Sequence, residues 1–204
     1  MDKEQIIKAF QFRHACKEFD SEKKIANEDL RFILETGRLS PSSFGLEQWK
    51  FLVIQKDEDK SKLQKACFEQ KQLTTCSDVV VVLGKIGLYH AGSEYVSKMF
   101  KRWGFPDDIY NFMLNFHSSM VKEMDLTQWS VEQCHIAAAN MMTAAALIGI
   151  DSCPIGGFQP EQVKEILALD SEKFIPTLIL TFGYRKNEQP PKIRLAFDEV
   201  VEFF

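Results

Sequence analysis

The sequence lacks a long hydrophobic run and has no excess of positive charge. Its longest apolar stretch, residues 136–150, contains Asn140 and Thr143, and it is shorter than the roughly 20 apolar residues that a membrane-spanning helix requires. The formal net charge is -4, which argues against a basic surface for nucleic acid, and no polybasic tract adjoins an apolar helix as a membrane anchor would need. We therefore expect neither a nucleic-acid partner nor a membrane partner.

Motifs for metal and dinucleotide binding are also missing. The five cysteines form no Cys-x-x-Cys pair, and the four histidines form no His-Glu-x-x-His motif, so we predict no metal site. No Gly-x-Gly-x-x-Gly segment is present, so no separate dinucleotide site is expected. Scattered cysteines in odd number fit a reducing compartment, and the mixed charge of the first residues does not fit a signal peptide. The expected location is the cytoplasm.

The composition is that of a soluble globular protein, and we predict one compact domain covering residues 1–204. Hydrophobic residues make up 45% of the chain, which at this length is enough for a substantial buried core. Helical spacing of apolar residues predicts a first helix that continues to the turn at 19–21, so that Arg13 and Lys17 would share one helical face. A second helix is predicted from Asn27, as its N-cap, to Gly37.

Short β-prone runs predict strands at 51–54, 78–84 and 177–184, of which the β-branched run at 78–84 would be central. Further helices are predicted within 57–73, over 160–169 and, most clearly, over 128–148. In that last helix, alanines permit close approach of other backbones, and Gly149 provides a stop. By themselves these elements indicate only a helix-and-sheet class.

Residues 85–127 are rich in aromatic side chains at irregular spacing and are broken by Gly104-Phe105-Pro106-Asp107. We predict a short-helical excursion outside the main sheet. Aromatic residues at irregular spacing are usually local core, and that interpretation stays open. We favour a cover over the active site for flat substrates.

The final segment, residues 189–204, is an apolar tail. Pro190 and Pro191 force an extended chain, and the residues that follow include the apolar Leu195, Phe197, Val200, Val201, Phe203 and Phe204. Burying each such side chain stabilises by about 1.5–3 kcal/mol, so docking onto another surface is favoured. The simplest acceptor is a second copy of the chain, which predicts a two-fold homodimer with this tail as its arm.

Four short patches stand out: Arg-His-Ala-Cys-Lys at 13–17, Pro-Ser-Ser at 41–43, Pro-Ile-Gly-Gly-Phe at 154–158 and Lys-Ile-Arg at 192–194. Each patch alone has an ordinary explanation, as a solvated face, a helix stop, a turn or a solubilised tail. In this order and together they resemble the FMN-dependent nitroreductase family, the oxygen-insensitive NAD(P)H nitroreductases, over nearly the whole chain. The resemblance is closest to the subgroup that activates nitroimidazole prodrugs.

The resemblance implies an α+β fold with a mixed, mainly antiparallel central sheet flanked by helices. It also implies a homodimer with exchanged C-terminal arms and two sites at the interface. The cofactor would be FMN and the co-substrate NAD(P)H. The reaction would be ping-pong, in which NAD(P)H gives hydride to the flavin and leaves before a nitroaromatic, quinone or related electron-poor acceptor takes two electrons.

Residue roles also follow from the resemblance. Arg13, Lys192 and Arg194 would bind the FMN phosphate, which suits guanidinium and ammonium groups. Lys17, the one residue assigned to catalysis, would lie near N1 and O2 of the flavin and stabilise the negative charge of the reduced ring. The implied cofactor contacts are Arg13, His14, Ala15, Lys17, Pro41, Ser42, Ser43, Gly45, Glu69, Lys71, Gln72, Pro154, Ile155, Gly156, Gly157, Lys192 and Arg194.

Within that set, residues 41–43 and Gly45 would come from the other subunit, and the backbone amides of Gly156 and Gly157 would face N5 and O4. Many relatives carry serine in place of Ala15, asparagine in place of Gly45 and glutamate in place of Gly156. Loss of the first two side chains removes hydrogen bonds worth about 0.5–1.5 kcal/mol each, so we expect weaker FMN retention. The change at Gly156 should be milder, because its contact is through the backbone.

Two other functions stay open from the sequence. One is an FMN-binding sensor or carrier that turns over slowly. The other is a thiol-dependent enzyme using Cys16 or Cys153, in which His14 would lower the pKa of the Cys16 thiol. Residues two apart on a helix point away from each other, which disfavours that pair. Cys153, next to the proposed flavin turn, could be a neighbour of the ring or a structural cysteine.

Overall fold

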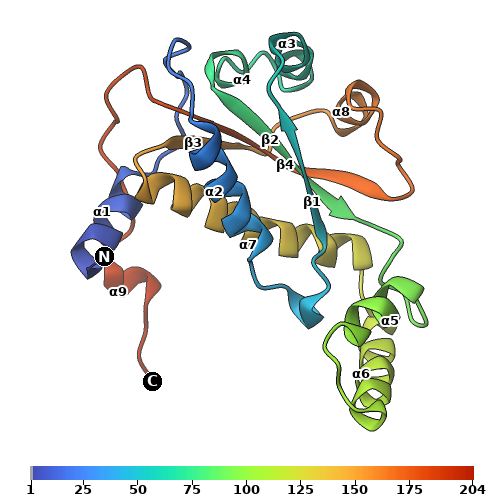
Figure 1. Cartoon of the computed structure of the whole chain (residues 1–204). Coiled ribbons are helices and arrows are strands. Elements are labelled where there is room, and N and C mark those ends of the chain that lie inside the picture. Colours follow the sequence, from blue (N-terminus) through green and yellow to red (C-terminus); the bar gives the residue numbers. More distant parts are fainter. Residues whose placement is uncertain (1) are drawn as a thin grey trace.

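The computed structural model describes residues 2–204, and over that range the chain is built around a four-stranded sheet (Figure 1). The strands lie in the order β1 (Trp49–Ile54), β2 (Asp78–Lys85), β4 (Phe174–Gly183) and β3 (Asp151–Ile155). Each neighbouring pair is antiparallel. A parallel bridge between Ala15 and Ser152 adds the N-terminal segment to the β3 edge. The predicted α+β class and mainly antiparallel sheet are therefore confirmed.

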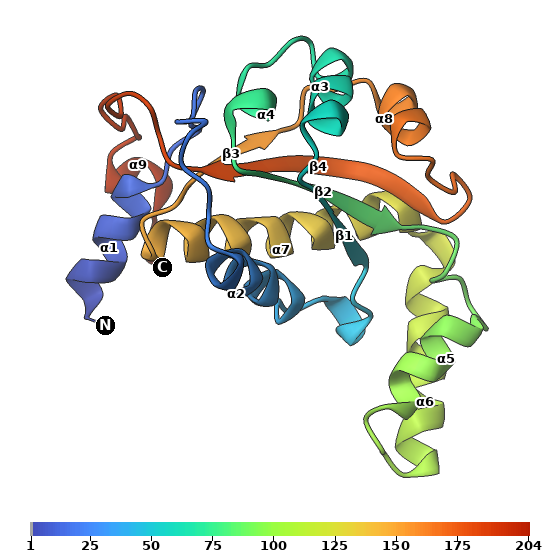
Figure 2. The ribbon, with the colours of Figure 1, turned by 45° about the horizontal axis from the view of Figure 1, so that its top comes forward.

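Helices cover both faces of the sheet, which forms the middle of three layers (Figure 2). One face carries α7 (Leu126–Leu147) and α2 (Asn27–Arg38), and the other carries α3 (Asp57–Ala66), α4 (Gln72–Thr75) and α8 (Pro160–Ile166). Strand β2 is buried along nearly its whole length. This burial explains why the strand is a continuous β-branched run, since a strand covered on both faces needs no alternating polar residues.

Helix α7 is the central helix, as predicted. Its small residues Ala137, Ala138 and Ala145 are buried in one core with Ile33 of α2 and Val80 of β2. Side chains this small let helix α7 approach the sheet closely. Within residues 2–204 no helix, α7 included, combines the length and the apolarity needed to cross a membrane.

Residues 85–127 leave the sheet and contain α5 (Glu94–Lys101), α6 (Asp107–Met120) and the 3-10 turn η2 (Val121–Glu123). Helices α5 and α6 contact each other and project away from the sheet (Figures 1 and 2). A separate aromatic core containing Tyr89, Phe100 and Trp129 holds their base. This excursion therefore has its own packing and is joined to the sheet through the first turns of α7.

The two ends of the chain lie together. Helix α1 (Lys3–Phe12) begins with a capping box between Asp2 and Gln5, and the short helix α9 (Phe197–Val200) lies beside it (Figures 1 and 2). The tail side chains are exposed, and Phe203 is 86% exposed. An apolar arm of this kind gains little stability from the single chain.

Two predictions about helix ends are wrong. Helix α1 ends at Phe12, and Arg13 already has extended backbone. The following residues run along β3 instead, because the Cys16 N–H donates to the Ser152 carbonyl at 3.1 Å and Ala15 forms an isolated parallel bridge with Ser152. Arg13 and Lys17 therefore do not share a helical face. Asn27 is the first residue of α2 and not its N-cap, which is Ala26 without a side-chain hydrogen bond.

Two further elements differ from the sequence prediction. The predicted helix within 57–73 is split into α3 and α4, because Phe68 and Glu69 adopt left-handed φ values of 55° and 58° between them. Strand β3 was not predicted, since polar Asp151 and Ser152 and a proline give no β-prone pattern. Pairing with β4, which is available only in the folded chain, makes it a strand.

Candidate active site

Cationic residues from both ends of the chain line one cavity of about 580 Å³. Arg13 comes from the segment after α1, and Lys192 and Arg194 come from the tail. The remaining lining residues, which belong to α1, α7 and β3, are Ile7, Phe10, Gln11, Ala139, Met142, Thr143 and Pro154. The sequence-predicted residues Arg13, Pro154, Lys192 and Arg194 are thus brought together across the full length of the chain.

The cavity holds positive charge without a compensating acid, since none of its lining residues among 2–204 is Asp or Glu. The Lys192 ammonium donates to the backbone carbonyls of Phe10 and Arg13. Burial and the neighbouring charges of Arg13 and Arg194 lower the pKa of Lys192. Clustered cations that repel one another favour an anionic ligand, and phosphate suits the fork of arginine and the ammonium of lysine.

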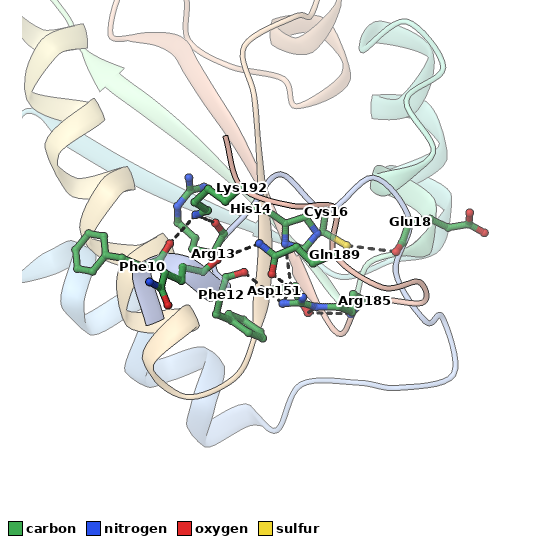
Figure 3. A network of polar contacts seen from close by, with 11 residues as sticks. Phe10, Phe12, Arg13, His14, Cys16, Glu18, Asp151, Arg185, Gln189 and Lys192 are labelled. Atoms are coloured by element: carbon green, nitrogen blue, oxygen red, sulfur yellow. Dashed lines mark hydrogen bonds and ion pairs between the residues drawn. The ribbon is translucent and has the colours of Figure 1, made fainter. Parts of the chain in front are cut away.

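A buried ion pair holds these segments in place (Figure 3). Asp151, 3% exposed, lies 2.6 Å from Nη2 of Arg185. The same guanidinium lies 4.0 Å from the centre of the Phe12 ring, and Gln189 donates to the Gln11 carbonyl at 3.0 Å. The carboxylate of Asp151 is therefore paired with Arg185. This ion pair anchors the start of β3 to the segment after β4 and to the end of α1.

Sequence reasoning missed this anchor. Asp151 is a single acid beside an apolar segment, and Arg185 is one of two adjacent bases after a predicted strand, so neither belongs to a recognisable motif. The one available signal was the position of Arg185 directly after the predicted strand 177–184. The structure also places His14 here, with Nδ1 3.6 Å from Oδ1 of Asp151, and burial together with Arg185 lowers the pKa of His14.

A second cavity of about 300 Å³ lies along the same edge segment. Its lining includes His14, Ala15, Lys17 and Lys71, together with Glu188, which directly precedes the tail. Residues 13–17 therefore contribute to both cavities, since Arg13 lines the first and the residues after it line the second.

Several predicted contacts meet around the Cys153 sulfur. Nζ of Lys17 and Nε2 of Gln72 each lie 3.8 Å from Cys153 Sγ. Gln72 also donates to Gln70 at 2.8 Å, and Gln70 donates to the Gly157 carbonyl at 3.0 Å. The Cys153 thiol is buried, and burial raises its pKa despite the opposing charge of Lys17. Lys17, Gln72 and Gly157 are thereby linked through one hydrogen-bonded cluster.

The glycine turn after β3 is open. Gly156 and Gly157 are exposed, and a Cβ at either would meet no atom closer than 3.8 Å within the chain. The protein's own packing therefore does not require glycine there, which fits a ligand that approaches the backbone closely. Ile155 is buried at the end of β3, and Glu69 is exposed on the left-handed turn before α4.

The remaining predicted residues lie elsewhere in the single chain. Pro41, Ser42, Ser43 and Gly45 belong to the connection between α2 and β1 and line neither cavity. They pack near the first half of α7, where the Ser43 N–H donates to Gln133 at 2.9 Å. One chain therefore brings together the cationic and glycine patches but not residues 41–45.

The structure removes the reason for a thiol enzyme at Cys16. Residues 13–17 are not helical, yet His14 faces Asp151, and the Cys16 thiol donates to the Glu18 carbonyl at 3.3 Å. Burial and the nearby Asp151 charge raise the pKa of Cys16 to about 11. A protonated, buried thiol is a weak nucleophile.

Comparison with known proteins agrees with this geometry. The sequence model described as the nitroreductase family matches residues 11–184. The chain is 47% identical over 214 residues to a "putative NAD(P)H nitroreductase" of Staphylococcus haemolyticus, with 98% of this chain and 97% of that protein covered. It is 42% identical over 218 residues to a protein of the same description from Bacillus subtilis, with 98% of both covered.

Solved structures share the fold. A "putative NAD(P)H:FMN oxidoreductase" of Staphylococcus epidermidis superimposes with a TM-score of 0.84 at 26% identity, covering 98% of this chain and 95% of that one. A "putative nitroreductase" of Exiguobacterium sibiricum, solved in complex with FMN, gives a TM-score of 0.83 at 24% identity and covers 100% and 98%. With a family match over most of its length, this chain belongs to the nitroreductase family.

Proposed function

We propose that this FMN-dependent NAD(P)H nitroreductase reduces nitroaromatics, quinones and related electron-poor acceptors by a ping-pong mechanism. One observation carries the proposal: Arg13, Lys192 and Arg194, from opposite ends of the chain, line one cavity that has no carboxylate among its described lining residues. Such a cavity is suited to a phosphate group. The FMN complex of the Exiguobacterium sibiricum structure supports the same cofactor.

The residues present fit FMN in two regions. Arg13, Lys192 and Arg194 would hold its phosphate. Lys17, with Gln72 beside it, would face the pyrimidine edge of the ring, and the open Gly156 and Gly157 backbone would face the opposite edge of the same ring system. The other predicted contacts, from His14, Ala15, Glu69, Lys71, Pro154 and Ile155, belong to the segments that join these regions.

When bound, FMN would supply the redox chemistry, accepting a hydride from NAD(P)H and passing two electrons to the acceptor. Lys17 would balance negative charge at the pyrimidine edge, where Cys153 and Gln72 restrict its position. The sequence has no Gly-x-Gly-x-x-Gly site for a dinucleotide. In the ping-pong mechanism that the resemblance implies, donor and acceptor would use the same place in turn.

The site would be completed by a second copy of the chain. In the single chain, Phe197, Val200 and Phe203 are each more than 60% exposed, at 63%, 63% and 86%. Burial of these side chains on a partner would stabilise a homodimer. The same assembly would bring Pro41, Ser42, Ser43 and Gly45 of one subunit to the cofactor of the other.

The excursion at 85–127 would then cover the active site. Phe112 and Phe116 of α6 are exposed, and their rings stack with an interplanar angle of 5°. A flat, exposed aromatic surface is suited to flat acceptors. For location we propose the cytoplasm, because all five cysteines are free thiols and free thiols are typical of reducing compartments.

The test is the visible spectrum of the purified protein with added FMN, recorded before and after NADPH. We expect a bound flavin spectrum that bleaches with NADPH and returns on addition of a nitroaromatic or quinone over many turnovers. Bleaching without turnover would favour the sensor or carrier alternative. A protein that does not bind FMN would contradict the proposal.

A further inference from the structure

The connection between α2 and β1 is strained and tightly held. Phe44, Gly45 and Glu47 have φ values of 54°, 60° and 51°. Residues other than glycine keep such a left-handed backbone only where surrounding contacts impose it. Strain of this kind is often found at functional sites, so the contacts that impose it are informative.

Two buried amide side chains hold the backbone of Ser43 from both sides. The Ser43 N–H donates to Oε1 of Gln133 at 2.9 Å, and the Ser43 carbonyl accepts from Nε2 of Gln48 at 3.3 Å. Gln133 is 8% exposed and Gln48 is fully buried. The neighbouring Ser42 hydroxyl is already used, since it accepts from the Glu47 N–H at 2.9 Å.

The Ser43 hydroxyl, in contrast, makes no hydrogen bond with any of residues 2–204 and belongs to a half-buried residue. The Ser43 backbone is satisfied by Gln133, by Gln48 and by the Leu46 N–H, which also donates to the Ser43 carbonyl at 3.3 Å, while its own hydroxyl is left available. Aromatic packing restricts the turn further, because the Phe44 ring lies 5.3 Å from His117 in an edge contact. The backbone position from which this hydroxyl extends is therefore set by the surrounding protein.

Helix α7 supplies the polar anchors. Gln133 bonds to Ser43, and Asn140, two helical turns later, donates to the Ser40 hydroxyl at 2.8 Å. Residues seven apart lie on one face of a helix. The same helix lines the cationic cavity through Ala139 and Met142. Helix α7 therefore connects the cationic cavity of a chain to the turn at residues 41–45, which that chain would place in the site of its partner.

We propose that Gln133 is a positioning residue of the active site. It does not touch the cofactor; by accepting from the Ser43 N–H, it holds the Ser43 backbone in the position from which the hydroxyl contacts the FMN bound by the partner subunit. This inference rests on the proposed function, because it requires an FMN site completed by residues 41–45 of a second copy.

The experiment measures FMN dissociation constants by flavin fluorescence for the full-length protein and four variants. Gln133→Met keeps the side-chain length and removes the acceptor, Gln133→Glu restores an acceptor, and Ser43→Ala removes the hydroxyl. Gln128→Met, at an exposed position of the same helix, is the matched control. We expect about a 5-fold weaker affinity for Gln133→Met and Ser43→Ala, which corresponds to one lost hydrogen bond, and no change for the control.

Two further readouts distinguish positioning from general stability. The dimer and the melting temperature should be retained in Gln133→Met, and Gln133→Glu should recover most of the affinity. A double variant combines Gln133→Met with Ser43→Ala. If Gln133 acts through Ser43, this double variant should bind FMN no more weakly than either single variant. Should Gln133→Met fail to fold, Gln133→Asn, whose shorter side chain cannot reach Ser43, replaces it in the same cycle.

The inference is overturned if wild-type protein binds FMN while Gln133→Met or Ser43→Ala binds it equally well, or if the two effects add. Those results would leave the proposed function intact. A wild-type protein that binds no FMN would overturn the proposed function, and this inference with it.

Discussion

At the residue scale, the site depends on a few side chains whose surroundings fix their state. Lys17 lies 3.8 Å from the buried Cys153 sulfur, which Gln72 also contacts at the same distance. Cys16, although next to Lys17, is buried and its pKa is raised to about 11. The charge at this edge of the site therefore comes from the lysine and not from a thiolate.

Replacement of this charge is the sharpest test of a single residue. Lys17→Ala should lower the rate of NADPH oxidation by about 100-fold, in line with loss of a fixed charge that stabilises the transition state, and should weaken FMN binding. Stopped-flow kinetics and fluorescence titration measure the two effects. Lys17→Arg serves as the charge-retaining control, and wild-type values for both quantities in Lys17→Ala would rule out the role assigned to Lys17.

Gly45 gives a second test at this scale. Its φ is +60°, and a Cβ there would lie 2.7 Å from Cζ2 of Trp103. Gly45→Ala should therefore lower the free energy of unfolding by about 1–3 kcal/mol, through backbone strain and the clash. Gly104→Ala is a matched control, because its φ is +65° but no atom lies within 4 Å. Equal losses in urea unfolding of the two variants would show that Trp103 contributes nothing.

At the element scale, local sequence predicted the elements whose hydrophobic pattern is strong and missed those that depend on a partner strand. Helix α7 and strand β2 were predicted because alanine-rich and β-branched runs suit them. Residues 13–17 were wrongly placed in a helix, since nothing local shows that Ser152 will bond to Cys16. Strand β3 was missed for the same reason, as its pattern has meaning only beside β4.

The α5–α6 excursion is joined to the turn at Phe44 by His117, and this contact predicts a pH effect. His117 is 1% exposed among aromatic rings, and burial lowers its pKa below the ordinary 6.5. Below about pH 6.5 the unfolded chain therefore binds more protons than the folded chain. The free energy of unfolding is highest above that pH and decreases progressively as the pH falls. His14 adds to the effect with the same sign.

His117→Phe, which keeps the aromatic packing, should unfold with a weaker pH dependence between pH 7 and 5 than the wild type. Urea midpoints at several pH values measure the difference. The exposed position His90 provides the control, and His90→Phe should retain the wild-type pH dependence. A slope in His117→Phe identical to that of the wild type would show that His117 is not the group responsible.

At the scale of the whole molecule, the two ends of the chain meet at the cationic cavity. The ion pair of Asp151 and Arg185 and the bond from Gln189 to Gln11 fix that meeting. Beyond it, the exposed apolar tail marks the surface that we propose for dimerisation. Assembly and cofactor binding should therefore be coupled.

Removal of residues 196–204 tests this coupling while leaving Lys192 and Arg194 in place. We expect the shortened chain to be monomeric in analytical ultracentrifugation and to bind FMN at least 10-fold more weakly, since a shift of about 1.4 kcal/mol suffices for that factor. The substitution Phe32→Ser, at another exposed apolar position, is the control and should leave the dimer intact. A shortened chain that stays dimeric with full FMN affinity would contradict the arm's role.

Three features could be read from the sequence before folding was considered: the composition of a helix-and-sheet domain, its strongest helices and strands, and the four patches that resemble the nitroreductase family. These are local properties, set by hydrophobic spacing and residue type over a few positions. Three features arise only on folding: the bridge from Ala15 to Ser152 at the sheet edge, the anchoring of the chain ends by Asp151 and Arg185, and the shared cavity of Arg13 and Lys192. Contacts between segments that are far apart along the chain leave no periodicity in the sequence, because they form only when packing of the core brings those segments together.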